Sequence, residues 1–167
     1  MLTRMNDRGS RIISLMPHSH YTHASIALSE DPSTFYSFSV KGFRIEKPEK
    51  SLKKGREPYH CQFYTIDVSE NTYLAARALI RRFSENRETY RYSFLGICLA
   101  LLHIPFRKET RYFCSQFVAD ILKQSGALQM RKRTCLVLPG DFQKTEALKL
   151  AYTGNLQEYL QYSLTAV

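Results

Sequence analysis

Apolar residues follow two different patterns along this chain, and their order restricts the fold more than any other feature. Up to residue 68 the pattern predicts strands, over residues 23–28, 35–40 and 59–68. After residue 68 it predicts helices, over residues 69–83, 92–103 and 113–124. Because no internal repeat or linker divides these elements, we expect one α+β domain over residues 1–167.

Turn residues suggest how the strands pair. Glu30–Ser33 (EDPS) is a turn signal between residues 23–28 and 35–40, so these two strands are expected to form an antiparallel pair. Three further strands are expected: a central one at 59–68 and shorter ones at 42–45 and 148–152.

The helical segments have recognisable ends. Ser69 is suited to the N-cap of the first helix, and Gly126 is suited to stop the third. The most apolar segment, Phe94–Leu102, is well short of the roughly 20 residues that span a bilayer. It is therefore expected to be a buried helix, with Cys98 as a core residue.

The composition excludes several classes of protein. With 44% apolar and 13% aromatic residues, the chain can bury a core, which excludes disordered and collagen-like classes. The net charge of +9 makes an acidic partner or substrate plausible. Since the first residues contain no apolar stretch of signal-peptide length, we expect a cytoplasmic protein whose four cysteines are thiols.

The sequence contains no recognisable motif for a nucleotide site or a structural zinc site. The seven glycines form neither a Walker-type loop nor GxGxxG, and the cysteines form no CxxC. His18, His20 and His23, together with His60 and Cys61, are an alternative ligand set for zinc. Imidazoles on one short segment would not all face one ion without a tight turn, so we expect neither a metal nor a cofactor.

Cys114 is the best candidate nucleophile. It lies in the first turn of the third predicted helix, where unpaired N–H groups and the helix dipole favour a thiolate. His23 opens a strand and is followed by small residues, so another element can pack close to it. A nucleophilic thiol requires such a base within hydrogen-bond distance.

Spacing alone leaves a second interpretation open. Cys114 also shares a helical stripe with Phe117, Val118 and Ile121, as expected for a small buried side chain. His18 and His20 compete with His23 for the role of base.

Three stretches of the chain resemble the circularly permuted papain-like hydrolases: Tyr21–Leu28 (YTHASIAL), Phe35–Phe38 (FYSF) and Tyr112–Asp120 (YFCSQFVAD). That superfamily groups NlpC-type peptidases with lecithin:retinol acyltransferase-like enzymes and bacterial YiiX-like proteins. In its permuted members the histidine strand precedes the cysteine helix, as it does here. The likeness extends over nearly the whole chain, and it is greatest to a bacterial subgroup.

The resemblance implies a permuted papain-like fold, in which an antiparallel sheet packs against helices and the cysteine begins a helix. It assigns Cys114 as nucleophile, His23 as base and Ser37 as the third polar residue, with Ser39 on the same strand face. The family more often has His, Asn or an acidic residue at the third position. A serine hydroxyl adds no negative charge, so it would orient the imidazole only weakly.

The expected reaction is acyl transfer. Cys114 would attack an amide, ester or thioester carbonyl, and His23 would protonate the leaving group. The backbone N–H of Cys114, together with Tyr21, would hold the oxyanion. Water or another acceptor would then release the acyl group, and the substrate is expected to be a small molecule, a peptide or a lipid.

The alternative function is a non-catalytic basic module that binds nucleic acid or an anionic membrane surface. Lys41–Arg56 contains seven basic and two acidic residues, and Arg131–Arg133 adds a second cluster. Nucleic acid is the less favoured partner because no RNA-binding or helix-turn-helix signature is evident. In the resembling fold the first cluster lies at the rim of the site, where four cations would favour an anionic substrate: Lys41, Arg44, Lys53 and Lys54.

Overall fold

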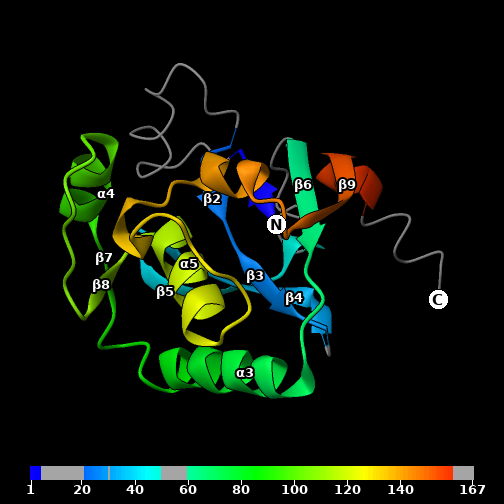
Figure 1. Ribbon diagram of the computed structural model, residues 1–167, viewed down its shortest axis with the longest axis horizontal. Helices are drawn as coiled ribbons and strands as arrows, with labels where there is room; N and C mark the ends of the chain where they lie inside the picture. Colours follow the sequence, from blue (N-terminus) through cyan, green and yellow to red (C-terminus); the bar gives the residue numbers. More distant parts are fainter. Residues whose placement is uncertain (5–20, 30, 50–59, 160–167) are drawn as a thin grey trace.

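The computed structural model describes residues 1–4, 21–29, 31–49 and 60–159. Four sequence candidates, His18, His20, Lys53 and Lys54, lie outside these ranges. The described chain is α+β, which confirms the predicted class. Helix α5 (Cys114–Gln124) lies at the centre of Figure 1, between the β6/β9 side of the molecule and the β7/β8 side, with α3 (Glu70–Glu85) below it.

Three sheets surround α5. The largest is antiparallel, with the strand order β2 (His23–Ala24), β1 (Leu2–Thr3), β6 (His60–Thr65) and β9 (Lys149–Asn155). The second is also antiparallel, with the order β3 (Ile26–Leu28), β4 (Asp31–Ser39) and β5 (Gly42–Glu46). The third pairs β7 (Arg91–Tyr92) with β8 (Arg111–Tyr112) in parallel. The expected central strand is thus β6, which lies between β1 and β9.

The strand predicted over residues 23–28 is divided between two sheets. β2 pairs with β1, whereas β3 pairs with β4 and forms the expected antiparallel pair. The break falls at Ser25, which is buried and donates its backbone N–H to the Met1 carbonyl at 2.9 Å. Ser25 therefore marks the point where the chain leaves one sheet for the other.

The β4–β5 hairpin depends on Gly42. Ser39 pairs with Gly42 across the turn, and the φ of Gly42 is +85°, in the left-handed region that favours glycine. A Cβ at this position would lie 2.7 Å from the carbonyl oxygen of Tyr90. Glycine thus allows both the turn and the close approach of the chain beside β7.

The helix ends match the sequence pattern. The Ser69 side chain accepts from the N–H of Thr72 at the start of α3, and Gly126, with φ +81°, follows the end of α5. The predicted stripe on α5 is buried, and Phe117 is completely enclosed. Its ring lies 5.3 Å from Phe38 and 5.1 Å from Phe83, measured between centroids, so aromatic packing fixes α5.

Helix α4 (Phe94–Leu101) corrects one prediction. Its Gly96, Ile97 and Ala100 are buried, but Leu95 is 57% exposed and Cys98 is also exposed. Burial of the whole segment, with Cys98 in the core, was therefore wrong, because the described part of the chain packs against only one side of this short helix. No described helix has the length and apolar character needed to cross a membrane.

Two short 3-10 helices, η1 (Thr134–Leu136) and η2 (Pro139–Lys144), connect α5 to β9. The second begins with Pro139, whose fixed φ suits the first position of a helix. Cys135 is buried within η1. The strand predicted at 148–152 is β9.

Candidate functional site

His23 connects the two antiparallel sheets through its side chain. It lies on β2 with 4% of its surface exposed, and its Nε2 is 3.1 Å and 3.2 Å from the two carboxylate oxygens of Glu46. Glu46 is the last residue of β5, in the neighbouring sheet. The Cys114 side chain is near enough to the same imidazole to raise its pKa. The ring on β2 thus interacts with a carboxylate from β5 and a thiol from α5.

Ser37 holds the carboxylate, and Glu46 occupies the position next to the ring that the sequence assigned to Ser37. The Ser37 hydroxyl donates to Glu46 Oε1 at 2.6 Å and is fully buried. In the β4–β5 register Ser37 pairs with Arg44, two residues before Glu46, so all three side chains share one face. Ser37 is thus connected to His23 through Glu46.

The charges of this cluster support one another. Burial disfavours the His23 imidazolium, but the Glu46 carboxylate and the hydrogen bonds to Cys114 and Glu46 outweigh it and raise the pKa of His23 well above 6.5. Burial likewise disfavours the carboxylate. The His23 charge, the hydrogen bonds from His23 and Ser37, and the charge of Arg44 nevertheless lower the pKa of Glu46 below 4.5. His23 and Glu46 therefore form an ion pair near neutral pH.

Cys114 begins a helix whose N-cap residue offers no hydrogen bond. α3 and α4 are capped by the side chains of Ser69 and Ser93, whereas the N-cap of α5 is Phe113, which provides none. The first-turn N–H groups of a helix have no partner within the helix. This helix start thus directs N–H groups and the positive end of the helix dipole toward the region of the cysteine sulfur.

No protein-family model, curated protein or solved structure matches this chain. The chemistry available to the site therefore follows from its own geometry.

The surroundings of Cys114 have features that bear on both interpretations. Cys114 is 2% exposed and continues the buried stripe of Phe117 and Val118. It also interacts with the His23 imidazole, a neighbour that an ordinary core cysteine lacks. Because an unpaired charge at such a buried position is costly, a thiolate here requires the imidazolium beside it.

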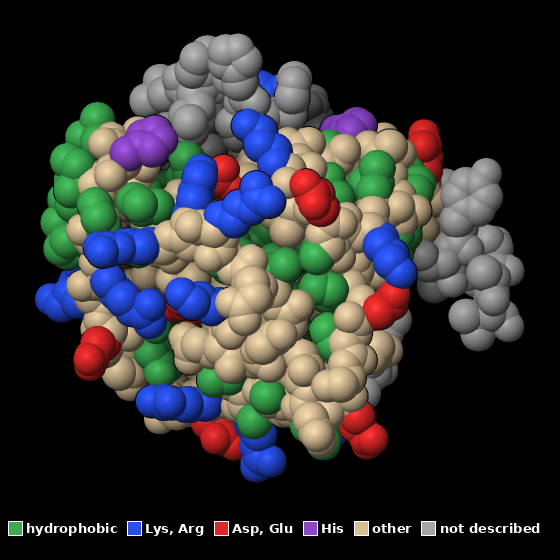
Figure 2. Space-filling view, in the orientation of Figure 1, with side chains coloured by type: hydrophobic (Ala, Val, Ile, Leu, Met, Phe, Trp, Pro, Cys, Tyr) green, Lys and Arg blue, Asp and Glu red, His purple; other side chains and the backbone are tan. Residues whose placement is uncertain are grey.

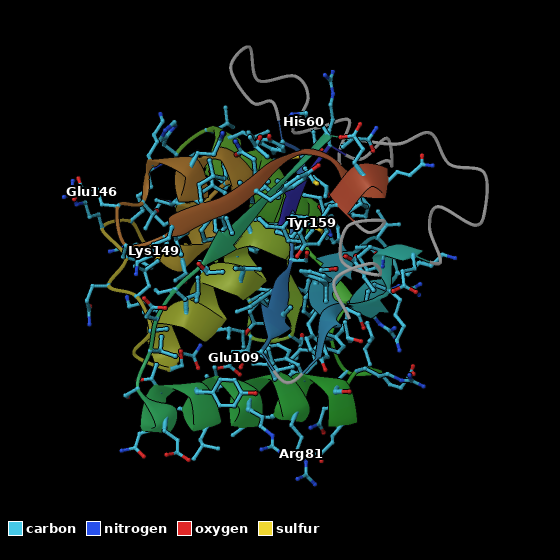
Figure 3. All side chains as sticks on the ribbon, turned by 90° about the vertical axis from the view of Figure 1, so that its right-hand side faces the viewer. His60, Arg81, Glu109, Glu146, Lys149 and Tyr159 are labelled. Atoms are coloured by element: carbon cyan, nitrogen blue, oxygen red, sulfur yellow. The ribbon has the colours of Figure 1, made fainter. Side chains whose placement is uncertain are left out.

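The hydroxyl of Tyr21 lies against the largest sheet. It is 2.9 Å from His60 Nδ1 and hydrogen-bonded to Thr153 on β9, and burial raises its pKa. His60 lies at the end of β6 farthest from α3 (Figure 3). These contacts hold the hydroxyl on β6 and β9. The Tyr21 hydroxyl is therefore engaged on the largest sheet, whereas the first-turn N–H groups of α5 lie at the start of the helix that carries Cys114.

Ser39 and the described rim cations lie along the β4–β5 hairpin. The Ser39 hydroxyl accepts from the backbone N–H of Lys41 at 3.3 Å, at the turn, whereas Glu46 pairs with Phe35 at the other end of the hairpin. Ser39 is therefore not brought to the imidazole. Lys41 and Arg44 are exposed, and only Arg44 adds positive charge beside Glu46.

Glu46 is the residue that the sequence interpretation missed. It directly follows the predicted strand 42–45, within the basic segment Lys41–Arg56, which drew attention only for its positive charge. Strand alternation places Glu46 on the face of Arg44, and the two-residue turn before Gly42 sets Arg44 opposite Ser37. The signal was the register of this hairpin, combined with a carboxylate at the end of its second strand.

An apolar cavity of about 350 Å³ is lined by residues of both antiparallel sheets and of helices α3 and α5. Its lining includes Ala24, next to His23 in sequence, and Val118, one helical turn after Cys114. Cys114, His23 and Glu46 do not themselves line it. Among the described residues, no three His, Cys, Asp or Glu side chains are grouped so that they could hold a metal ion.

Proposed function

We propose that this protein is a cysteine hydrolase or acyltransferase of the permuted papain-like type. Cys114 is the proposed nucleophile, His23 the base, and Glu46 the residue that positions the imidazole. The observation that carries the proposal is the His23 ring, which bridges the Cys114 side chain and the Glu46 carboxylate at the start of α5. Four free cysteines suit the reducing compartment in which such a thiol would work.

In the proposed first step, the Cys114 thiolate forms a bond to the carbonyl carbon of an amide, ester or thioester. The carbonyl π electrons move to oxygen, and the first-turn N–H groups of α5 stabilise the oxyanion. The oxyanion then collapses, the bond to the leaving group breaks, and the leaving group takes the proton of the His23 imidazolium.

The second step reverses these roles. Water or another acceptor attacks the Cys114 acyl thioester while His23 removes the acceptor's proton. Release of the acyl group regenerates the thiolate and the imidazolium. With water the product is a carboxylic acid, and with an amine or an alcohol it is an amide or an ester.

Glu46 strengthens the case for activity. The hydroxyl of Ser37, expected as third residue, would orient the imidazole without adding charge. A carboxylate on Nε2 both fixes the ring and stabilises the imidazolium that the first step requires. Because Glu46 acts through His23, it is a positioning residue.

The apolar cavity favours substrates with an apolar acyl group. Its lining is mostly apolar and includes Val118 and Leu122, which follow Cys114 along α5. We therefore expect esters of medium-chain acids to be turned over faster than acetate esters.

Turnover of p-nitrophenyl acetate and octanoate by the purified protein tests this proposal. Cys114→Ala is expected to lower the rate by at least about 10³-fold, because the reaction loses its nucleophile. Cys98→Ala is the matched control, since Cys98 is the exposed cysteine and should not be required. If Cys114→Ala keeps wild-type turnover, or Cys98→Ala loses it, the assignment of Cys114 fails.

A further inference from the structure

Helix α4 is apolar on both sides, but the described residues cover only one of them. Its sequence, FLGICLAL, contains no charged residue. Phe94 is 44% exposed, Leu95 is 57% exposed, and Leu102, at the C-cap, is 68% exposed. A helix that is apolar all round is normally buried. The outer side of α4 therefore has the character of a contact surface.

The turn after α4 extends this surface. His103 adopts φ +59°, and Ile104 donates its backbone N–H to the Leu99 carbonyl at 2.9 Å, as in a Schellman motif. This turn holds Ile104, 48% exposed, against the end of the helix. We call the surface the α4 face, and it comprises Phe94, Leu95, Cys98, Leu102 and Ile104. Figure 2 shows hydrophobic side chains gathered at this edge of the molecule.

Basic side chains lie next to the α4 face. Arg91 and Arg111 are exposed and stand opposite each other in the β7–β8 register, immediately before α4 and α5. Lys108 is also exposed. The next residue, Glu109, is exposed and acidic, so it offsets one of these three positive charges. In Figure 2 a group of Lys and Arg side chains lies below the hydrophobic edge. Apolar side chains bordered by cations are typical of a surface that contacts anionic lipid.

We propose that the α4 face docks on an anionic lipid bilayer. Its apolar side chains would enter the boundary between headgroups and acyl chains, and Arg91, Lys108 and Arg111 would meet the lipid phosphates and carboxylates. A symmetric contact with a second copy is less favourable. An isologous interface would bring two copies of the same cationic border into one contact without adding enough acidic side chains to pair with them.

Docking in this way brings the bilayer to the end of the molecule where the proposed nucleophile lies. β7 and β8 are parallel, so α4 and α5 begin at the same end of this pair, and Ser93 donates its N–H to the Tyr112 carbonyl at 3.0 Å. The start of α4 thus lies beside the residues that precede Cys114. The docking proposal does not depend on catalysis, and its tests use no turnover.

Flotation with vesicles tests the docking directly. Wild-type protein should float with phosphatidylcholine vesicles that contain phosphatidylserine, and much less with phosphatidylcholine alone. Leu95→Glu and Leu102→Glu should each lower the partition coefficient at least about tenfold. Leu74→Glu, on α3, is the matched control because Leu74 is 45% exposed on another surface, and this variant should float like wild type. Removing Arg91 or Arg111 should lower partition about fivefold.

Cys98 provides a second readout that is independent of activity. In the Cys114→Ala variant, an environment-sensitive thiol dye should label Cys98, since the other cysteines are buried. Its emission should shift to the blue when anionic vesicles are added.

The proposal is overturned if wild type does not float, if Leu74→Glu fails as Leu95→Glu does, or if the dye does not shift. Leu95-dependent dimers without vesicle binding, seen by analytical ultracentrifugation, would also overturn it and assign the face to a second copy.

Discussion

The Nε2 atom of His23 lies 3.1 Å from Glu46 Oε1, across the junction between two sheets. His23 belongs to the sheet built around β6, and Glu46 ends the hairpin strand β5. Their contact exists because the chain changes sheets at Ser25, directly after β2. The relative position of the two sheets thus determines whether the imidazole is oriented toward Cys114.

Glu46→Gln should lower the pKa of His23. Burial favours the neutral ring, and the Glu46 charge is the largest factor that opposes it. In wild type, His23 should titrate well above 6.5, and in the variant it should fall toward or below that value. Titration of the ring protons by NMR measures this change. Glu85→Gln, which removes an exposed partner of Arg81, should leave His23 unchanged; an unmoved His23 in Glu46→Gln would show that the carboxylate does not act on the ring.

Ser37→Ala and Ser39→Ala should differ, although the two serines share a strand face. Ser37 donates to the Glu46 carboxylate and is fully buried, so its loss should cost about 1–3 kcal/mol of unfolding free energy. Ser39 only accepts from a backbone N–H at the turn, and its loss should stay within about 0.5 kcal/mol. Urea denaturation measures both variants. Equal costs would contradict the role given to Ser37.

Local features of the helices were predictable from the sequence. Ser69, Gly126 and the stripe through Phe117 act within a few residues of each other, and each has the predicted role. The pairing of β3 with β4, the short strand at 42–45 and the central position of β6 were also predicted from alternation and turn residues.

Features that depend on distant packing were not predictable in the same way. The division of residues 23–28 at Ser25 requires β1, which lies more than twenty residues earlier. The exposure of Cys98 depends on which distant segments pack against α4, and a local sequence pattern does not contain this information. The register of the β4–β5 hairpin, which is local, places Glu46 near Ser37. The contact of Glu46 with His23 also requires the two sheets to meet, and this depends on distant packing.

Gly42→Ala should destabilise the hairpin that carries Glu46. The new side chain would meet an unfavourable φ and a carbonyl oxygen at 2.7 Å, so we expect a cost of about 1–3 kcal/mol. Gly140→Ala is the control, because its Cβ would meet only the Gln143 side chain at 3.9 Å. Thermal unfolding followed by circular dichroism compares the two. A Gly42→Ala variant as stable as Gly140→Ala would mean that the turn does not require glycine.

The ion pair between His23 and Glu46 should stabilise the protein over a defined pH range. The lowered pKa of Glu46 makes its contribution complete above about 4.5, and this contribution is lost as the pH falls through the lowered value. The raised pKa of His23 makes its contribution complete below about 6.5, and this is lost as the pH rises through the raised value. The stability difference between wild type and Glu46→Gln should therefore be largest between pH 4.5 and 6.5. A difference that does not change with pH would contradict the ion pair.

The central claim is that His23 activates Cys114, and site-resolved acylation tests it most directly. Wild type and His23→Ala are treated at neutral pH with an electrophilic acyl probe, and modification of each cysteine is measured by mass spectrometry. Exposed Cys98 serves as the internal reference. Cys114 should be modified faster than Cys98 in wild type, despite its burial, and at least about tenfold more slowly after His23→Ala. Unchanged modification of Cys114 in His23→Ala, or modification of Cys98 alone in wild type, would contradict activation of Cys114 by His23.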